Sequence, residues 1–257
     1  MIECQDVSFS YPASTLPDSE RQAGGALKHI SCTIEDGSFV LLCGTSGCGK
    51  TTMTRLFNGL IPHYHEGTYT GSVYLDGKDT RDLSLFDISL KVGSVFQNPR
   101  SQFFNVDTTS ELAFGPENHG IAEDLVRDRV KRVAAQLKLE PLLDRSIFSL
   151  SGGEKQRISI ARCILKDAPI VILDEATASV DTDNESYIQE AINELVKGKT
   201  LLVIAHRLNT IRQADQILVI SDGRISEQGT HDELMAKAGI YQDFVNIRKK
   251  ASGWSLA

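Results

Sequence analysis

Residues 38–60 have the sequence SFVLLCGTSGCGKTTMTRLFNGL. The apolar run at its start predicts a short buried strand that stops at a glycine. The turn that follows, GTSGCGKT at 44–51, fits the pattern GxxxxGK(S/T) at every position, and a helix ending at Gly59 is expected after it. In this arrangement backbone N–H groups converge and the helix N-terminus adds partial positive charge, so the loop is suited to bind phosphate groups.

The side chains of this loop suit a nucleoside triphosphate and its metal ion. Lys50 is long enough to reach the β- and γ-phosphates, and the Thr51 hydroxyl can ligate Mg²⁺. A chance glycine-rich turn is the alternative, and the strand and helix on either side argue against it. The residues of this segment predicted to contact ATP are Gly44, Thr45, Ser46, Gly47, Cys48, Gly49, Lys50, Thr51 and Thr52.

Two adjacent carboxylates follow a second apolar run. Asp174 ends the run IVIL, and Glu175 comes directly after it. A carboxylate at the tip of a buried parallel strand can hold Mg²⁺, directly or through water. Its neighbour can orient and deprotonate an attacking water molecule. A solvated acidic turn is the alternative interpretation, and the phosphate loop upstream favours the metal-binding and catalytic roles.

Periodicity along the rest of the chain predicts an α/β fold. Residues 1–11 alternate polar and apolar, as a half-buried strand does, and 12–25 have the composition of a surface loop. Continuous apolar runs at 169–174 and 200–206 are typical of a parallel sheet covered on both faces. Further expected elements are helices at 123–138 and 185–197, a hairpin at 216–229 turning at Asp222-Gly223, and a helix capped by Thr230 and Glu233.

Composition is that of an ordinary globular protein. The chain has 257 residues, 41% hydrophobic and 24% charged, and its formal net charge is −7. This acidic balance argues against a broad interface with a phosphate backbone, so no nucleic-acid partner is expected. No apolar run approaches the ~18 residues that cross a bilayer, and the start of the chain lacks the basic region of a secretory signal. The five cysteines include no CxxC pair, which favours reduced, packed thiols.

The stretch LSGGEKQ at 150–156 connects these features to a known family. Together with the phosphate loop and the Asp174-Glu175 pair, it resembles the signature of the nucleotide-binding cassette of ABC transporters. The resemblance extends from Phe9-Ser10-Tyr11 to about residue 245, with the motifs in the family's order. It implies an α/β P-loop fold with a mostly parallel core sheet, an antiparallel β subdomain and a helical subdomain. It also implies an ATPase whose cofactors are ATP and Mg²⁺.

Several residues take their roles from this resemblance. Tyr11 lies where the family places an aromatic side chain that stacks on adenine, although a tyrosine can also simply end a strand. Gln97, in VFQNP, is similar to the glutamine that senses the metal and the attacking water, and His206 is similar to the histidine that contacts the γ-phosphate. The implied catalytic residues are Glu175, His206, Gln97 and Lys50, the metal ligands are Thr51, Gln97 and Asp174, and further ATP contacts come from Tyr11, Ser151, Gly152, Gly153 and Asp181.

The signature residues 151–153 are expected to open a helix, so their backbone amides can form a second anion site. One chain cannot place both anion sites on one ATP if they lie on opposite lobes. The resemblance therefore implies two cassettes, identical or different, paired head to tail with nucleotides between them, and integral membrane subunits as further partners. Binding would close the pair and hydrolysis would release it. The expected location is the cytoplasmic face of the cell membrane, as a peripheral protein.

The two halves of the chain resemble different subfamilies. LFNGLIPHYHEG at 56–67 and VFQNPRSQFFNVDTTSELAFGPEN at 95–118 are similar to energy-coupling-factor cassettes, which drive import of vitamins and metal ions through separate membrane subunits. From ARCILKDAPIVILDEATASVDTDNE onward the sequence resembles exporter cassettes. Both types share LSGGEKQR, so the seam at this point leads to the hypothesis of a recombination between cassette genes or an assembled chimera.

The first half should dominate partner choice, because the Gln97 region contacts the membrane partner in the family. The favoured function is therefore the ATP-hydrolysing subunit of an energy-coupling-factor importer of a micronutrient. The subunit of an ABC exporter is the first alternative, and a non-transport ABC ATPase acting on DNA or in translation is the second. The predicted ATP-binding domain covers residues 1–246, with a helical subdomain at about 98–165, and a C-terminal tail covers 247–257.

Overall fold

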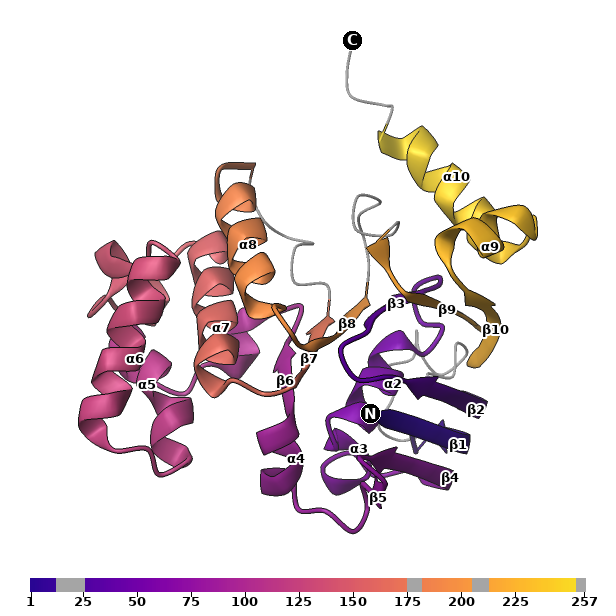
Figure 1. Ribbon diagram of the computed structural model, residues 1–257, viewed down its shortest axis with the longest axis horizontal. Helices are drawn as coiled ribbons and strands as arrows, with labels where there is room; N and C mark the ends of the chain where they lie inside the picture. The colour runs from indigo at the N-terminus through magenta and orange to yellow at the C-terminus, as the bar shows by residue number, and fades with distance from the viewer. Residues whose placement is uncertain (13–25, 175–181, 205–212, 253–257) are drawn as a thin grey trace. The chain divides into compact units, whose positions relative to one another are not determined.

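The computed structural model describes residues 1–12, 26–174, 182–204 and 213–252. The chain folds into two compact units (Figure 1). Unit 1 consists of Met1–Val92 and Thr200–Ala257, and unit 2 consists of Gly93–Lys199. The surface loop expected at 12–25 lies almost wholly outside the described residues.

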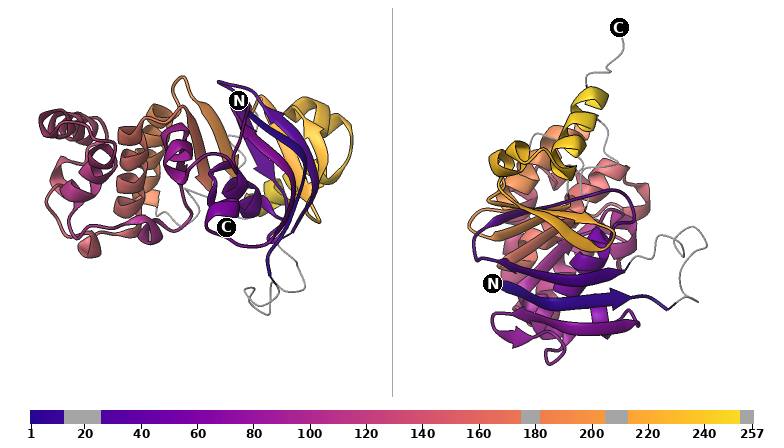
Figure 2. Two further views of the ribbon diagram at one scale, coloured as in Figure 1. Left: turned by 90° about the horizontal axis from the view of Figure 1, so that it is seen from below. Right: turned by 90° about the vertical axis from the view of Figure 1, so that its right-hand side faces the viewer.

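Unit 1 contains an antiparallel sheet with the strand order β2-β1-β4-β5, visible in Figure 2 as a curved layer. Its strands are β1 (Ile2–Ser10), β2 (Leu27–Ile34), β4 (Thr68–Leu75) and β5 (Lys78–Asp79). The expected alternation in β1 is confirmed, since Ile2, Cys4, Val7 and Phe9 are all buried. Cys4 and Val7 are three residues apart, whereas strict alternation would place them two or four apart, and the register between β1 and β2 shifts at this point. The shift keeps Ile2 and Cys4 on the same inner face as Val7 and Phe9.

The remaining strands of unit 1 follow the order β10-β9-β3-β8. They are β3 (Phe39–Cys43), β8 (Thr200–Ile204), β9 (Gln216–Ser221) and β10 (Arg224–Gly229). Strand β3 pairs in parallel with both β8 and β9, as the apolar runs predict, and β9 and β10 form the expected hairpin. Helices α9 (His231–Ala236) and α10 (Ile240–Ser252) supply Leu234 and Tyr241 to the core that covers Leu41 and Ile217.

The helices of unit 1 before residue 92 are α2 (Lys50–Phe57), α3 (Leu60–His63) and α4 (Leu85–Lys91). Helix α2 ends two residues before the predicted limit at Gly59. Asn58 leaves the helical conformation, and Gly59 has a φ of +75°, which only glycine adopts without strain, so it separates α2 from α3.

Unit 2 is mostly helical, as expected for the segment near residues 100–150. Helix α7 contacts the other three helices (Figure 1). The helices are α5 (Thr108–Asn118), α6 (Glu123–Gln136), α7 (Gly152–Lys166) and α8 (Thr182–Leu195), with short 3₁₀ turns at Pro99–Gln102, Glu140–Leu142 and Ile147–Ser149. Val126, Val130 and Val133 are buried along one face of α6, which confirms the predicted periodicity.

Two strands, β6 (Val92–Val95) and β7 (Ile170–Asp174), are neighbours in their sheet. All five residues of β7 are buried, as its continuous apolar run predicts. None of the helices within the described ranges has the length and apolar character that crossing a bilayer requires. Helix α10 extends past residue 247, and the domain limit at 246 stays a prediction.

Candidate functional site

The phosphate loop lies in unit 1 between a buried strand and a helix, as the sequence predicts. Strand β3 ends at Cys43, and α2 begins at Lys50. Two of the glycines are sterically required. A Cβ atom at Gly44 would lie 2.2 Å from the backbone carbonyl oxygen of Ile220, and Gly49 has a φ of +113°, a conformation that residues other than glycine rarely adopt. The loop therefore reaches its path between β3 and α2 only with glycine at these positions.

The N-terminus of α2 lacks the side-chain cap that several other helices of the described chain carry. Its cap residue, Gly49, offers no side-chain hydrogen bond, and its first turn carries no acidic residue. Three other helices, α4, α7 and α9, carry complete capping boxes, formed by Ser84 with Asp87, Ser151 with Glu154, and Thr230 with Glu233. The chain thus leaves the positive end of the α2 dipole without its own anion, which fits an external phosphate.

Lys50 lies folded over this loop. Its ammonium donates to the carbonyl oxygens of Thr45 and Gly44, at 2.7 and 3.1 Å. It also lies 3.8 Å from the Sγ atom of Cys48, a buried side chain. The ammonium is thus placed at the loop, where a phosphate oxygen could replace a carbonyl as its partner. The donor set of this loop fits the phosphates of ATP.

Tyr11 is connected to the same helix. Its hydroxyl accepts a hydrogen bond from Arg55 Nη1 in α2 at 2.8 Å. Its ring meets the ring of Phe9 edge-on at 4.8 Å and that of His65 at 5.9 Å. Burial, assisted by the nearby Arg55 charge, lowers the pKa of His65 from its ordinary value. The structure thus brings Tyr11 and the helix of the phosphate loop into one cluster, although its role toward adenine stays a prediction.

The signature residues open helix α7, as the sequence predicts. Ser151 is the cap residue, and its hydroxyl accepts a hydrogen bond from the Glu154 amide at 3.2 Å. The Glu154 carboxylate in turn accepts from the Ser151 amide at 2.7 Å. Gly152 faces open space, since a Cβ atom there would meet nothing within 4 Å. The Ser151 hydroxyl is therefore engaged within its own helix, and the backbone beside it is accessible.

The other predicted site residues lie in unit 2, in unit 1 or outside the described residues. Asp174 is the last residue of β7 and is buried, whereas Gln97 follows β6 and is exposed; both belong to unit 2. Thr51 and Thr52 are in the first turn of α2, in unit 1, with Thr52 buried. Glu175, Asp181 and His206 lie outside the described residues, so their predicted roles stay predictions.

The sequence analysis did not predict an ion pair that the structure shows in unit 2. Glu111 in α5 is fully buried, and its Oε1 atom lies 2.9 Å from Arg162 Nη1 in α7. The partners are far apart in the chain, so no local pattern connects them. Arg55, the partner of Tyr11, was missed for the same reason. The sequence of α5, TTSELAFGPEN, mixes polar and apolar residues, so it gives no local signal that Glu111 is buried.

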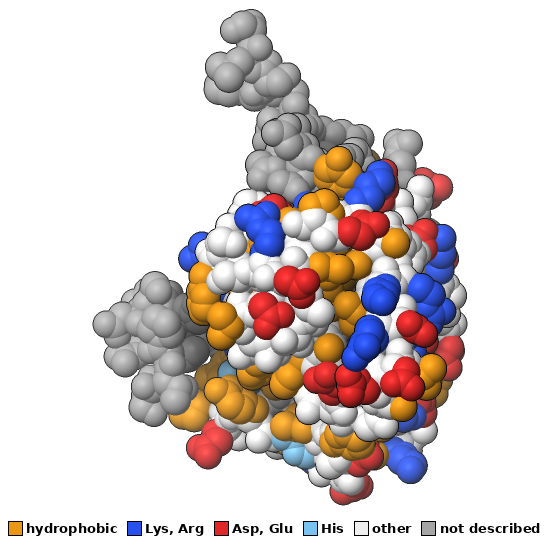
Figure 3. All heavy atoms as spheres, turned by 90° about the vertical axis from the view of Figure 1, so that its left-hand side faces the viewer, with side chains coloured by type: hydrophobic (Ala, Val, Ile, Leu, Met, Phe, Trp, Pro, Cys, Tyr) orange, Lys and Arg blue, Asp and Glu red, His pale blue; other side chains and the backbone are white. Residues whose placement is uncertain are grey.

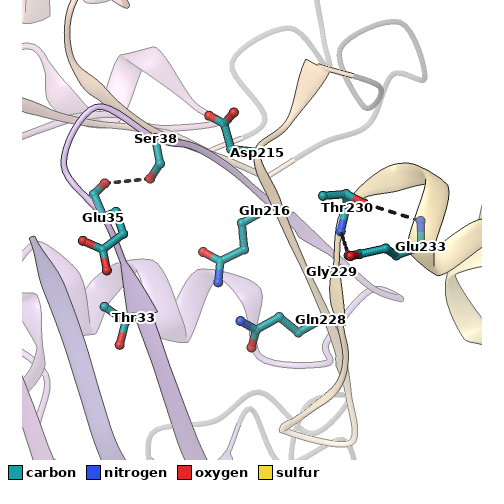
Figure 4. A pocket seen from close by; sticks show the side chains of 9 residues that line it. All are labelled: Thr33, Glu35, Ser38, Asp215, Gln216, Gln228, Gly229, Thr230 and Glu233. Carbon is teal, nitrogen blue, oxygen red and sulfur yellow. Dashed lines mark hydrogen bonds between the residues drawn. The ribbon is translucent and has the colours of Figure 1, made fainter.

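A polar pocket of about 490 Å³ also lies in unit 1 (Figure 4). It is lined by Thr33, Glu35, Ser38, Asp215, Gln216, Gln228, Gly229, Thr230 and Glu233, none of them in the phosphate loop. Two of its carboxylates already serve the fold. Asp215 accepts from the Phe39 amide and Glu233 from the Thr230 amide, each at 2.8 Å. These bonds hold the start of β3 and the start of α9.

Unit 2 exposes several large apolar side chains. Figure 3 shows one face of the molecule, on which hydrophobic side chains gather among charges of both signs. The most exposed in unit 2 are Phe148 and Phe104, at 79% and 72%, together with Val106 and Leu125. The ring of Phe104 stacks on that of Phe114 at 5.0 Å.

Comparisons with known proteins show the family of this chain. The family described as ABC transporter matches residues 27–178. A protein of Treponema denticola named as an ABC transporter ATP-binding protein is 40% identical over 91% of this chain and 46% of its own length. The ATP-dependent lipid A-core flippase of Vibrio parahaemolyticus is 41% identical over 96% of this chain and 41% of its own length.

Among solved structures, a bacterial Atm1-family ABC exporter with ATP bound is similar. Its TM-score is 0.77 at 29% identity, over 96% of this chain and 41% of that one. The chain thus spans less than half the length of these relatives. The family match covers more than half of the chain, including the loop at 44–51 and the signature at 150–156. The chain therefore belongs to the ABC transporter family, whose ATP-binding, ATPase cassette it forms.

Proposed function

We propose that this chain powers the transport of a solute across a membrane by binding and hydrolysing ATP between two paired cassettes. The observation that carries the proposal is the start of helix α2. Its N-terminus has neither a side-chain cap nor an acidic first turn, and the Lys50 ammonium lies over the loop before it. An anion with several oxygen atoms satisfies both groups together.

The residues proposed to hold Mg²⁺ are Thr51, Gln97 and Asp174. A hydroxyl, an amide and a carboxylate oxygen are ligands that this ion accepts in nucleotide sites. When bound, Mg²⁺ supplies positive charge that stabilises the transferring phosphoryl group. The position of Asp174 supports its role, because a carboxylate at the end of a buried strand can hold Mg²⁺ directly or through water.

The proposed catalytic step is attack of water on the γ-phosphate. Glu175 orients and deprotonates the water, while Lys50 and His206 stabilise negative charge on the transferring group. Gln97 senses the metal and the water. These roles come from the resemblance, and Glu175 and His206 lie outside the described residues.

A second cassette is the first proposed partner, joined head to tail, as an identical or a different chain. Ser151, Gly152 and Gly153 would contact the ATP held by the neighbouring cassette. The open space in front of Gly152 supports this role, since no described residue lies within 4 Å of a Cβ atom built there. The Ser151 hydroxyl accepts from the Glu154 amide and would donate its own hydrogen to phosphate, and Asp181 is a further proposed contact.

Integral membrane subunits are the second proposed partner, at the cytoplasmic face of the membrane. The exposed side chains of Phe104 and Val106 support this, because they follow Gln97 in the segment that meets the membrane partner in the family. Their burial in an interface would remove apolar surface from water. No nucleic-acid partner is proposed. The predicted domain, residues 1–246 with a helical subdomain at about 98–165, also stays a proposal.

For the direction of transport, export is placed ahead of import. The comparisons do not confirm energy-coupling-factor import, which the segments at 56–67 and 95–118 lead us to expect. The named flippase and exporter relatives match over 96% of this chain, which supports the export alternative. Import remains the second candidate on the two segments alone. Sequencing the locus tests the recombination hypothesis, since two adjacent cassette genes of the two types support it and an isolated gene weakens it.

The variant Glu175→Gln tests the ATPase proposal. It should keep ATP affinity and slow turnover by roughly 10²–10⁴-fold, because the base that activates water is removed. Glu123→Gln, at an exposed ion pair on α6, is the matched control and should hydrolyse ATP at the normal rate. Near-normal hydrolysis by Glu175→Gln refutes its assignment.

Co-purification from membranes tests the transport proposal. The tagged chain is expected to retain integral membrane proteins in mild detergent, and mass spectrometry of these proteins then distinguishes importer from exporter subunits. Retention of DNA or ribosomes in place of membrane proteins contradicts transport and favours the non-transport alternative.

A further inference from the structure

The loop that carries Gln97 is closed at its base by one side chain. Gln102 ends the 3₁₀ turn that starts at Pro99, and its Nε2 atom donates to the carbonyl oxygen of Ser94 at 3.1 Å. Its Oε1 atom accepts from the amide of Phe96 at 3.3 Å. The Gln102 side chain thus binds the backbone just before residues 97–101, and its own backbone follows them, so the two ends of this segment are held together.

The same side chain is bound to the signature helix. Ser159 in α7 donates from its hydroxyl to Gln102 Oε1 at 2.7 Å. One helical turn further along, Arg162 donates to the carbonyl oxygen of Gln102. Residues three apart lie on the same face of a helix, so one face of α7 holds the base of the loop through two bonds.

Glu111 fixes the residues that follow. Its Oε2 atom accepts from the amides of Asn105 and Phe104 at 2.7 and 2.9 Å, and its Oε1 atom pairs with Arg162 at 2.9 Å. The carboxylate is fully buried, so loss of these partners would leave a costly uncompensated charge. Arg162 also lies over the rings of Phe103 and Phe104, at 5.9 and 6.0 Å.

These contacts all connect one loop to one helix. The loop carries the residue proposed to sense the metal and the attacking water, and α7 begins with the signature serine. A buried ion pair adds little net stability compared with well-packed apolar residues, so stability alone gives a weak reason for this arrangement. A rigid connection explains it better, because buried polar bonds fix a geometry that apolar contacts would allow to slide.

We propose that Gln102, Glu111 and Arg162, here called the loop clamp, make the Gln97 loop and the start of helix α7 respond to nucleotide as one rigid piece. The clamp residues are positioning residues, since they act through Gln97 and Ser151. The proposal rests on the function proposed above. With the clamp intact, a shift of Gln97 on ATP binding moves the signature residues with it; without the clamp, the loop moves alone.

The test is amide hydrogen exchange on the full chain, with and without Mg²⁺-ATP, in the wild type, Glu111→Gln and Glu123→Gln. In the wild type and the Glu123→Gln control, ATP should change exchange in residues 97–105 and 151–156 together. Glu111→Gln should speed exchange at the Phe104 and Asn105 amides about tenfold or more, because each loses a charge-assisted bond. Its response to ATP should be confined to 97–105.

Steady-state kinetics gives a second measure. Glu111→Gln should keep its Kd for ATP within about twofold while kcat falls about tenfold, because only the residues positioned for the chemical step are disturbed. If Glu111→Gln loses its cooperative thermal transition, Ser159→Ala replaces it, since it removes one neutral hydrogen bond and should uncouple the two segments in the same sense. Equal, joint responses to ATP in the wild type and in a folded clamp variant overturn the clamp and leave the proposed function standing. A wild-type chain with no ATP affinity overturns the proposed function itself, and the clamp's role with it.

Discussion

Arg55 in helix α2 donates a hydrogen bond from Nη1 to the Tyr11 hydroxyl at 2.8 Å. Because α2 begins at the phosphate loop, this bond fixes the position of Tyr11 relative to the loop. The Phe9 ring supports the tyrosine ring edge-on from strand β1. An aromatic side chain held in this way is prepared to stack on a base without first losing rotamer freedom.

Replacement of Tyr11 by Ala should weaken ATP binding about tenfold, because stacking of a base on an aromatic ring contributes ~1–3 kcal/mol. Tyr11→Phe should lose less affinity than Tyr11→Ala, because it keeps the ring and loses only the hydrogen bond from Arg55. Calorimetry with ATP and with inorganic tripolyphosphate separates the two parts of the ligand, since only ATP has a base. Equal losses for both ligands would show that Tyr11 acts through the phosphate loop.

Replacement of Lys50 by Ala should reduce ATP affinity by about 10²-fold, since hydrogen bonds to a charged group contribute ~1.5–3 kcal/mol each. The thermal midpoint of the nucleotide-free protein should change little, because the Lys50 ammonium bonds to two carbonyl oxygens that water can also solvate and makes one long contact with Cys48 Sγ. Lys78→Ala, an exposed lysine in β5, is the matched control. Unchanged affinity in Lys50→Ala would refute the role of the loop.

A thiol alkylator is expected to block ATP binding through Cys48. Its Sγ atom is 2.7 Å from the point where a Cβ atom at Gly44 would lie, so an added group has no room and must displace the loop. Affinity should fall at least about tenfold, as expected when a binding geometry is lost. Cys48→Ala should bind ATP and be insensitive to the alkylator. If the variant stays sensitive, another of the buried cysteines is responsible.

Stability should decrease as the pH falls from 7.5 to 5.5. Burial lowers the pKa of His65 and of His119 from 6.5, with smaller effects of Arg55 and Lys166. Because the unfolded chain then binds protons more readily than the folded one, this stability is fully present above the unfolded pKa and is lost progressively as the pH falls from that value through the lower folded pKa. Thermal midpoints of His65→Gln and His119→Gln should depend less on pH than those of the wild type. A pH dependence identical in all three proteins contradicts this assignment.

The sequence predicted those parts of the molecule that local rules determine. The glycines at 44 and 49, the strand before them and the helix after them follow one spacing pattern, and the capping box at Thr230 follows another. The α2 limit was wrong by two residues, because the asparagine that ends the helix has no strong signal of its own. Element ends are set by single residues, whereas element types are set by a whole periodic run.

Contacts between distant residues were beyond such rules. Neither Glu111 nor Arg162 stands out in the chain, and only the packing of α5 on α7 brings them together. The Arg55–Tyr11 bond similarly depends on how β1 and α2 meet. The resemblance predicts catalytic residues, but it gives no account of what holds them in place.

The bare start of helix α2 has a consequence for the protein before it meets its ligand. A helix terminus without a cap frays first, so opening and proteolytic nicking should begin near Lys50 when nucleotide is scarce. Bound ATP would accept hydrogen bonds from the uncapped amides of the first turn of α2. Part of the free energy of ATP binding would then stabilise the fold. The ATP concentration in the cell would therefore also affect how fast the chain is degraded.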